Sequence, residues 1–512
     1  MFPRLFSTGG IVLYSLIFTL PLLITLLQTN LGSLREAVSN SYYLHILRFS
    51  FTQALLSALL SLAVGIPGAL IMSYRSFRFK RQLKALFYLP FILPPILVVL
   101  GFVIFYGNSG YLNKILFSLF GVKIKILYSF TAVLLAHTFY NFPIVITLVS
   151  NSINKLGHSC EEAALVDGAS AWKSFTSIIL PRILPSALSA AIIVFLYCFT
   201  SFAIILVLGG GPQLTTLEVE IYRQARISSN IPMASALSIL STVTVVIVLL
   251  INSAVENRSS EYETDYSGVR VSRLSFVERI YLTLVTLFVS LPLLSIFIKS
   301  FSASAWKSAA RVIGSAVNSL GIALVSAVVS TLLALSLSYL ISLSSGRRKG
   351  LIMTYCTLPM VTSSVILGLS YYVVSRSFGF LPGFFLLALS HGALSAPFGV
   401  RTITSVWKDI PPELAESART SGAAESTVFF KIHLPLLKPA VLSCLMFSFA
   451  ISMGELNATM ILSPSSFTTI PLQIYRMVAA YNYEGACALG SVLCLICFSV
   501  FFVFSRDGED LS

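Results

Sequence analysis

Stretches of about 20 consecutive apolar residues recur along the whole chain, and they limit the folds open to it. A helix of that length crosses the hydrocarbon core of a membrane, whereas helices on a soluble core carry polar residues at helical spacing. Of the 512 residues, 56% are hydrophobic and only 11% are charged. These properties predict an all-α integral membrane protein.

Twelve apolar runs are long enough to form membrane-spanning helices. They lie near residues 9–28, 50–74, 85–106, 127–150, 185–208, 233–255, 280–299, 315–344, 351–374, 383–405, 439–462 and 485–505. The first run is too long for the apolar part of a typical signal peptide, so we expect a retained span.

A polar stretch at 256–279 separates six runs from six and is expected to be a linker. The predicted domains are an N-terminal span with its loop (1–45), a first transmembrane domain (46–255), the linker, a seventh span with its loop (280–312) and a second transmembrane domain (313–505).

Basic residues between the runs predict how the chain is oriented. They follow the second and the eighth runs: Arg75, Arg78, Lys80, Arg81 and Lys84, and Arg347, Arg348 and Lys349. The positive-inside rule places such loops in the cytoplasm, and the even number of runs then places both termini and the linker there too. Because the topology accounts for many of the positive charges, we expect no nucleic-acid partner.

The two halves of the chain repeat each other at an offset of 254 residues. Matched pairs include His137 with His391, Gly168 with Gly422 and Pro181 with Pro435. An even number of spans in each half gives both halves the same orientation in the membrane. The sequence therefore predicts two tandem, parallel six-helix repeats.

One repeated segment is polar and lies between apolar runs. It reads EEAALVDGASAWKSFTSIILP at 161–181 and ESARTSGAAESTVFFKIHLP at 416–435. An acid favours the start of a helix, a glycine suits the turn that ends it, and a proline suits the first turn of the next helix. The pattern predicts two short helices joined at a glycine, a suitable docking site; the alternative is a connecting loop without a partner.

The segment resembles the EAA motif of ABC importer permeases, in which Glu-Ala-Ala, three residues, Gly and nine residues precede Ile-x-Leu-Pro. The second copy differs from that pattern only at Ser417. The resemblance implies a type I ABC importer permease fold and docking to two copies of a cytoplasmic ATP-binding subunit. The residues to which it assigns this coupling role are Glu162, Ala163, Ala164, Gly168, Leu180 and Pro181, and Glu416, Ser417, Ala418, Gly422, Leu434 and Pro435.

Two copies of the motif in one chain resemble the fused permeases, a subgroup that includes the iron(III) and thiamine branches. Four stretches of the first half resemble the thiamine branch: HILRFSFTQALLSALLS (45–61), FYGNSGYLNK (105–114), LLAHTFYNFP (134–143) and CFTSFAIILVLGGGPQLTTLEVEIYRQA (198–225). The stretch MGELNATMILSPSSFTTIPLQIYRM (453–477) resembles the wider fused group at least as well.

The resemblance implies import of thiamine, and of its phosphates, across a bacterial inner membrane by alternating access. The substrate would be delivered by a periplasmic or lipid-anchored solute-binding protein. Import of iron(III) or another small solute is the alternative.

Glu455 lies in the eleventh apolar run. An ionisable residue inside a span is costly and usually faces a cavity or a partner. We expect Glu455, Asn457 and Ser201 on the substrate pathway, where a carboxylate favours a cationic substrate. The alternative is that Glu455 bonds to a polar neighbour within the helix bundle.

Other functional classes fit the sequence less well. Because no Gly-x-x-x-x-Gly-Lys-Ser/Thr loop occurs, we expect no enzyme activity and no cofactor on this chain, with ATP and Mg²⁺ used by the partner subunits. His137 and His391 lack a second ligand at helical spacing, and Cys494 and Cys497 lack a second cysteine pair, so no metal site is expected. A secondary transporter has no use for two docking segments, and a channel would need a filter-like repeat.

Overall fold

The computed structural model describes the chain except for residues 1, 157–165, 257–273, 311, 361, 379–382, 464–466 and 510–512. Its described part contains helices and no strand, which confirms the predicted all-α class. Most of the predicted linker, 256–279, lies outside the described residues.

The helices of the first half, with π and 3-10 helices written η, are α1 (Phe2–Tyr14), η1 (Ser15–Thr19), α2 (Leu20–Leu27), α3 (Leu31–Ser39), α4 (Ser41–Tyr74), α5 (Lys80–Ile92), α6 (Pro95–Tyr106), α7 (Tyr111–Phe120), α8 (Phe130–Leu156), α10 (Ala171–Ser174), η2 (Phe175–Ile179), α11 (Leu180–Phe199), α12 (Ala203–Leu208), η3 (Pro212–Leu214), α13 (Leu217–Tyr222), η4 (Arg223–Ile227) and α14 (Ile231–Glu256).

Those of the second half are α15 (Phe276–Ser300), α16 (Ala303–Ala310), α17 (Ile313–Ser342), α18 (Gly346–Thr357), η5 (Leu358–Met360), α19 (Ser364–Phe378), α20 (Gly383–Lys408), α21 (Pro412–Thr420), α22 (Glu425–Val428), η6 (Phe429–His433), α23 (Leu434–Gly454), α24 (Asn457–Leu462), α25 (Ile470–Ala479) and α26 (Tyr483–Glu509).

The internal repeat predicted from the sequence is visible in these elements. The helix α10 and the π-helix η2 recur 254 residues later as α22 and η6. Further along, α12 recurs as α24 at the same offset. Since π-helical turns are rare, a π-helix at the same place in both halves is a specific sign of the repeat.

Eleven helices in the described part are long and apolar enough to cross a membrane, and a bent pair of helices brings the number to twelve. The predicted count of twelve is therefore confirmed if the bent pair is one span. This pair, α18–η5 with α19, is bent by 88°.

The third and ninth spans, predicted at 85–106 and 351–374, are wrong as single helices. The ninth is the bent pair, and the third is divided between α5 and α6. Leu93 is extended there, with φ −76° and ψ 141°, because a residue followed by a proline disfavours the helical conformation.

The fifth and eleventh spans, predicted at 185–208 and 439–462, are also wrong as single helices. The first of them is divided into α11 and α12, and the second into α23 and α24. The break falls at the same place in both repeats. Apolar residues flank both breaks, so hydropathy alone could not reveal them.

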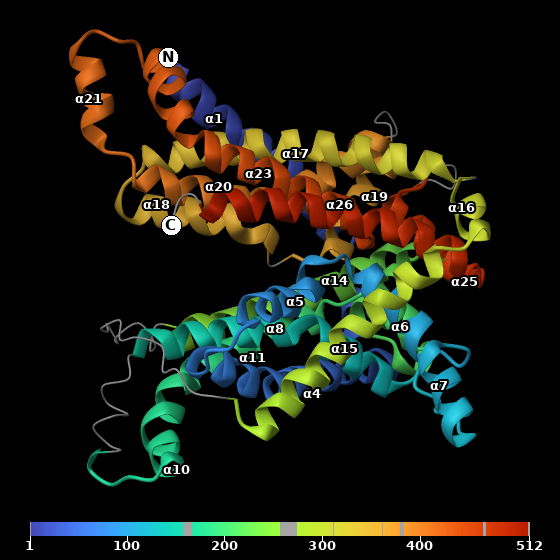
Figure 1. The fold of residues 1–512 in the computed structure, drawn as a ribbon. Coiled ribbons are helices and arrows are strands. Elements are labelled where there is room, and N and C mark those ends of the chain that lie inside the picture. Colours follow the sequence, from blue (N-terminus) through green and yellow to red (C-terminus); the bar gives the residue numbers. More distant parts are fainter. Residues whose placement is uncertain are drawn as a thin grey trace. The chain divides into compact units, whose positions relative to one another are not determined.

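The chain divides into two compact units, which we describe separately. Unit 1 contains residues 1–37, 220–242 and 300–512, and unit 2 contains residues 38–219 and 243–299. Three long helices pack on one another in each unit, α17, α20 and α23 in unit 1 and α4, α8 and α11 in unit 2 (Figure 1). The domain boundaries given by the sequence stay a prediction.

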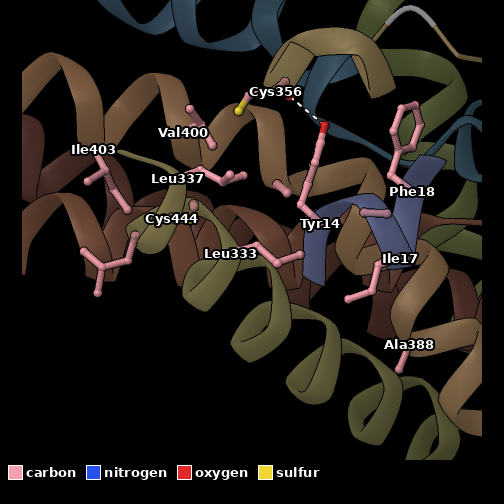
Figure 2. Close-up of a cluster of buried hydrophobic side chains, with 14 of the residues drawn as sticks. Tyr14, Ile17, Phe18, Leu333, Leu337, Cys356, Ala388, Val400, Ile403 and Cys444 are labelled. Atoms are coloured by element: carbon pink, nitrogen blue, oxygen red, sulfur yellow. Dashed lines mark hydrogen bonds between the residues drawn. The ribbon is translucent and has the colours of Figure 1, made fainter. Parts of the chain in front are cut away.

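The first span belongs to unit 1, together with most of the second half. Its helices α1 and α2 contact α17 and α19, respectively. Figure 2 shows Tyr14 donating a hydrogen bond of 2.9 Å to the carbonyl oxygen of Cys356. Ile17 and Phe18 lie in the same buried cluster as Leu333 of α17. The start of the first half thus packs on helices of the second half, in the core of unit 1.

The seventh span, α15, belongs instead to unit 2. Its Tyr281 hydroxyl donates to the carbonyl oxygen of Val64 in α4, at 2.5 Å. The ring of Phe288 meets that of Phe139 in α8 edge-on, with centroids 5.5 Å apart. The start of the second half thus packs on the helices of the first.

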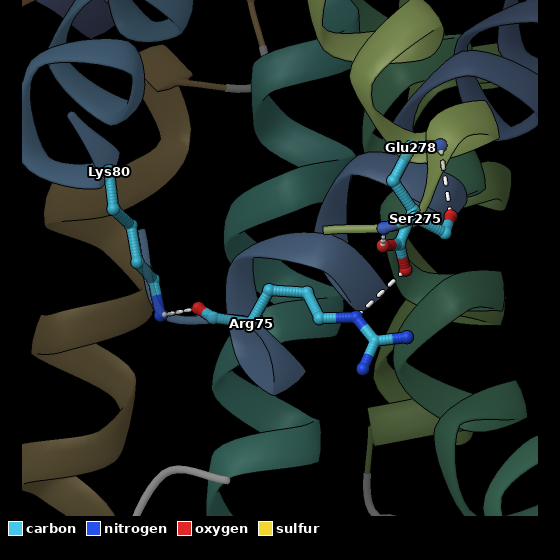
Figure 3. Close-up of polar contacts among 4 residues, drawn as sticks. All are labelled: Arg75, Lys80, Ser275 and Glu278. Atoms are coloured by element: carbon cyan, nitrogen blue, oxygen red, sulfur yellow. Dashed lines mark hydrogen bonds and ion pairs between the residues drawn. The ribbon is translucent and has the colours of Figure 1, made fainter. Parts of the chain in front are cut away.

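The first turn of α15 is connected to the loop after α4 (Figure 3). Glu278 accepts the Ser275 N–H at 2.7 Å, and its own N–H reaches the Ser275 hydroxyl at 3.2 Å, which is a capping box. Arg75 Nε lies 2.8 Å from the same carboxylate. On the other side of the loop, Lys80 donates to the carbonyl oxygen of Arg75 at 2.8 Å.

Candidate functional site

The second copy of the repeated polar segment is a helix, a tight turn and a second helix. The first of these, α21, exposes most of its residues, and only Ala415 is fully buried. Glu416 and Ser417 are both exposed. Figure 1 shows α21 standing apart from the long helices of its own unit. The segment therefore presents an unobstructed helical surface.

Gly422 makes the turn that ends α21. The Gly422 N–H reaches the Arg419 carbonyl at 2.9 Å, and the Ala423 N–H reaches the Ala418 carbonyl at 3.0 Å, which is the Schellman pattern. Gly422 has φ +85°, and a β-carbon there would meet nothing within 4 Å. Its backbone conformation, rather than crowding, therefore favours glycine.

An ion pair joins the two sides of this turn. Arg419 donates from Nε at 2.6 Å and from Nη2 at 3.2 Å to the two carboxylate oxygens of Glu425. The Glu425 carboxylate raises the pKa of Arg419. Because exposed pairs contribute little to stability, the main effect of this two-pronged contact is to fix the direction of α21 relative to α22.

Aromatic side chains hold the base of the segment. Phe429, which is buried, lies 5.2 Å from both Tyr339 and Phe6, measured between ring centroids. The ring of Trp407 lies 5.1 Å from that of His433, measured between centroids, and is tilted by 33°. The segment then continues without a break from η6 into α23. The segment is thus joined directly to the long helix α23.

The last two residues of the second copy begin α23. Leu434 is its first residue, and Pro435 lies in its first turn, as the sequence predicted. In the first copy Leu180 and Pro181 begin α11 in the same way.

The rest of the first copy is described only in part. Glu162, Ala163 and Ala164 lie outside the described residues. Gly168 has φ +85°, the same value as Gly422. Both glycines therefore have the same positive φ, in the left-handed region.

Glu455 lies in the break between α23 and α24. Its backbone is extended, and its carboxylate accepts the Ala458 N–H at 3.0 Å, so it caps the short helix α24. Asn457 donates to the Ser364 hydroxyl at 2.9 Å. The sequence did not single out Ser364, because a serine beside an apolar run carries no specific signal.

Ser201 occupies the same place in the first repeat, 254 residues before Glu455. It lies between α11 and α12, and its N–H reaches the Cys198 carbonyl at 3.3 Å. The two predicted pathway positions are therefore equivalent in the repeat, and each lies at a helix break.

The two matched histidines are buried within their units. His391 is hydrogen-bonded to Ser452 at 2.9 Å and to Thr459 at 3.1 Å, and His137 to Ser57 at 3.1 Å. Cys494 and Cys497 are also buried. In the described part of the chain no group of three or more His, Cys, Asp or Glu residues could hold a metal ion.

Comparison with known proteins identifies relatives of the whole chain. This chain is 26% identical to the thiamine transport system permease protein ThiP of Haemophilus influenzae, over 93% of this chain and 91% of that protein. To the protein of the same name from Escherichia coli it is 25% identical, over 91% of this chain and 89% of that protein. To the ferric transport system permease protein FbpB of Actinobacillus pleuropneumoniae it is 25% identical, over 81% of this chain and 64% of that protein.

Among solved structures, part of the chain matches a bacterial ABC transporter involved in the import of the acidic polysaccharide alginate. The TM-score is 0.44 at 19% identity, over 49% of this chain and 93% of that chain.

A family model described as the inner membrane component of binding-protein-dependent transport systems matches residues 65–261 and 330–508. The two matches cover most of the chain, one in each half. The chain therefore belongs to this family of permeases.

Proposed function

We propose that this chain supplies both halves of the membrane-spanning part of an ATP-driven importer of thiamine and its phosphates. The observation that carries the proposal is the presence in one chain of two polar segments with the same turn, at Gly168 and Gly422, both with φ +85°. One docking segment per half is what a permease needs if it is driven by two ATP-binding subunits.

The geometry of the second segment supports a coupling role. An exposed helix, held in direction by the Arg419–Glu425 pair, suits docking to a soluble subunit. Its aromatic base and its continuity with α23 suit the transmission of movement into the membrane. The first segment, with Glu162, Ala163 and Ala164, would do the same through η2 and α11.

The same segment supports the predicted orientation. Tyr339, near the end of α17, lies 5.7 Å from Trp407, near the end of α20, measured between ring centroids. Because α21 follows α20 directly, it lies at the end of α17 that precedes the basic residues of α18. The positive-inside rule favours this end as cytoplasmic, together with both termini.

The relatives favour thiamine over iron(III). Two relatives named as thiamine permeases match at least 91% of this chain. The match to the relative named as a ferric permease covers 81% of this chain and 64% of that relative. A thiamine substrate also fits a carboxylate on the pathway, because the thiazolium ring of thiamine is cationic.

We place Glu455, Asn457 and Ser201 on the pathway. The two helix breaks at which they lie are equivalent in the two repeats, and irregular backbone at membrane depth is tolerated where it lines a cavity or is buried in protein. Of the two breaks, only that of the second half carries a carboxylate, Glu455.

The substrate and the energy source are tested together in proteoliposomes that contain this chain, its ATP-binding subunits and its solute-binding protein. We expect labelled thiamine to accumulate when ATP is present on the side of the ATP-binding subunits, and a proton gradient alone to drive no uptake. Accumulation of ferric iron but not thiamine would overturn the substrate, and uptake driven by protons alone would overturn the mechanism.

The turn at Gly422 is tested with Gly422→Val and Gly422→Asn. A β-branched residue in the left-handed conformation costs about 1–2 kcal/mol, whereas asparagine visits that conformation routinely. We expect Gly422→Val to lower thiamine uptake per ATP hydrolysed severalfold and Gly422→Asn to retain it. Equal coupling in the two variants would show that the turn has no part in coupling.

The pathway role of Glu455 is tested with Glu455→Gln. Glutamine keeps an oxygen to accept the Ala458 N–H, so the cap on α24 survives while the charge is lost. We expect uptake of thiamine to fall about tenfold, as when roughly 1.4 kcal/mol of stabilisation of the cation is lost. Glu455→Ala, which removes cap and charge, is the control for stability. Unchanged uptake by Glu455→Gln would exclude a role for the charge.

A further inference from the structure

One pair of matched positions outside the coupling segments differs in charge between the two halves. The sequence Ile-Tyr-Arg occurs at 221–223 and, 253 residues later, at 474–476. Just before it stands Glu220 in the first half and Gln473 in the second. Each of these residues lies three positions before the arginine, which on a helix places the two side chains on one face.

In the first half the arginine is neutralised within the chain. Arg223 Nε lies 3.1 Å from Oε2 of Glu220, whose side chain is fully buried. Arg223 Nη2 donates to Oε1 at 3.3 Å, and the Gln224 amide donates to the same oxygen at 2.6 Å. The carboxylate of the first half is thus satisfied by its own neighbours.

In the second half the equivalent arginine keeps an exposed charge. Arg476 is exposed on α25, and Gln473 cannot neutralise it. Among the residues that the structure describes, Arg476 makes no ion pair. An external carboxylate would therefore restore the pairing that Glu220 provides in the first repeat.

Arg476 also lines a cavity of about 350 Å³. The other lining residues are Ser308 and Val312, before α17, and Gln473, Met477, Ala480 and Asn482, around the end of α25. Asn482 accepts the Gly485 N–H through its side-chain oxygen at 3.1 Å, which leaves its amide nitrogen as a donor. A lining that combines arginine, serine and amide donors with apolar side chains suits a carboxylate on an aliphatic stem.

The cavity lies far from α21. Ser308 and Val312 precede the first residue of α17, whereas α21 lies beyond its last turn, near Tyr339. The 30 residues of α17 extend over roughly 45 Å. If α21 faces the cytoplasm, this cavity faces the outer side, where a solute-binding protein docks.

We propose that the cavity around Arg476 receives an aspartate or glutamate side chain of the solute-binding protein. The carboxylate pairs with the guanidinium as Glu220 pairs with Arg223, and its aliphatic stem lies against Met477 and Val312. This site orients the binding protein on the second half of the permease. The inference rests on the proposed import function and on the orientation derived with it.

The test measures the affinity of the complete transporter in lipid nanodiscs for the solute-binding protein that supports its uptake. We expect Arg476→Gln to weaken docking roughly tenfold, since it removes one partner of a charge pair. Gln473→Glu should weaken docking similarly although no positive charge is lost, because the new carboxylate occupies Arg476. The control is Lys307→Gln, which removes an exposed cation of α16 that does not line the cavity, and it should change the affinity less than twofold.

Wild-type affinity in Arg476→Gln overturns the inference, and so does an equal loss in Arg476→Gln and Lys307→Gln, which would indicate a general effect of charge. Uptake measured in the same preparations separates this result from the proposed function. A wild-type transporter that takes up no thiamine contradicts the proposed substrate, whereas normal thiamine uptake with unchanged docking of Arg476→Gln contradicts only the site.

Discussion

A backbone N–H or C=O group in the hydrocarbon core of a membrane has no water to bind, and this constraint governs the whole chain. Long helices satisfy it within themselves. Where the spans break, other groups in the chain do so: Glu455 accepts the Ala458 N–H, and the Ser201 N–H reaches the Cys198 carbonyl. Because both breaks occur at equivalent positions, they are a property of the repeat and not an accident of one half.

The same constraint explains why the first span of each half packs with helices of the other half. An apolar helix can cover any apolar surface, and specificity comes from a few polar contacts. The Tyr14 hydroxyl donates to the carbonyl oxygen of Cys356 in unit 1, and the Tyr281 hydroxyl donates to that of Val64 in unit 2. Neither half therefore has its full set of contacts within its own sequence, as is usual for repeats that bury their faces against each other.

Some of this structure could be predicted because particular residues leave no alternative. Gly422 was predictable as a turn, since glycine readily adopts a positive φ, and Pro435 was predictable in a first helical turn. The break before α24 was not, because hydropathy treats Glu455 as one polar residue in an apolar run. The packing of the first span could not be foreseen either, because a pattern of hydrophobicity does not distinguish one apolar run from another. The cavity at Arg476 was not predictable either, because its lining residues come from two separate segments of the chain.

We propose that one chain supplies both halves of the permease and both docking segments. Native mass spectrometry of the transporter, purified through a tag on this chain, tests it most directly. We expect one 55.7 kDa chain bound to two copies of the ATP-binding subunit. A complex that contains two copies of this chain with two ATP-binding subunits would contradict it, because each chain would then supply only one working half.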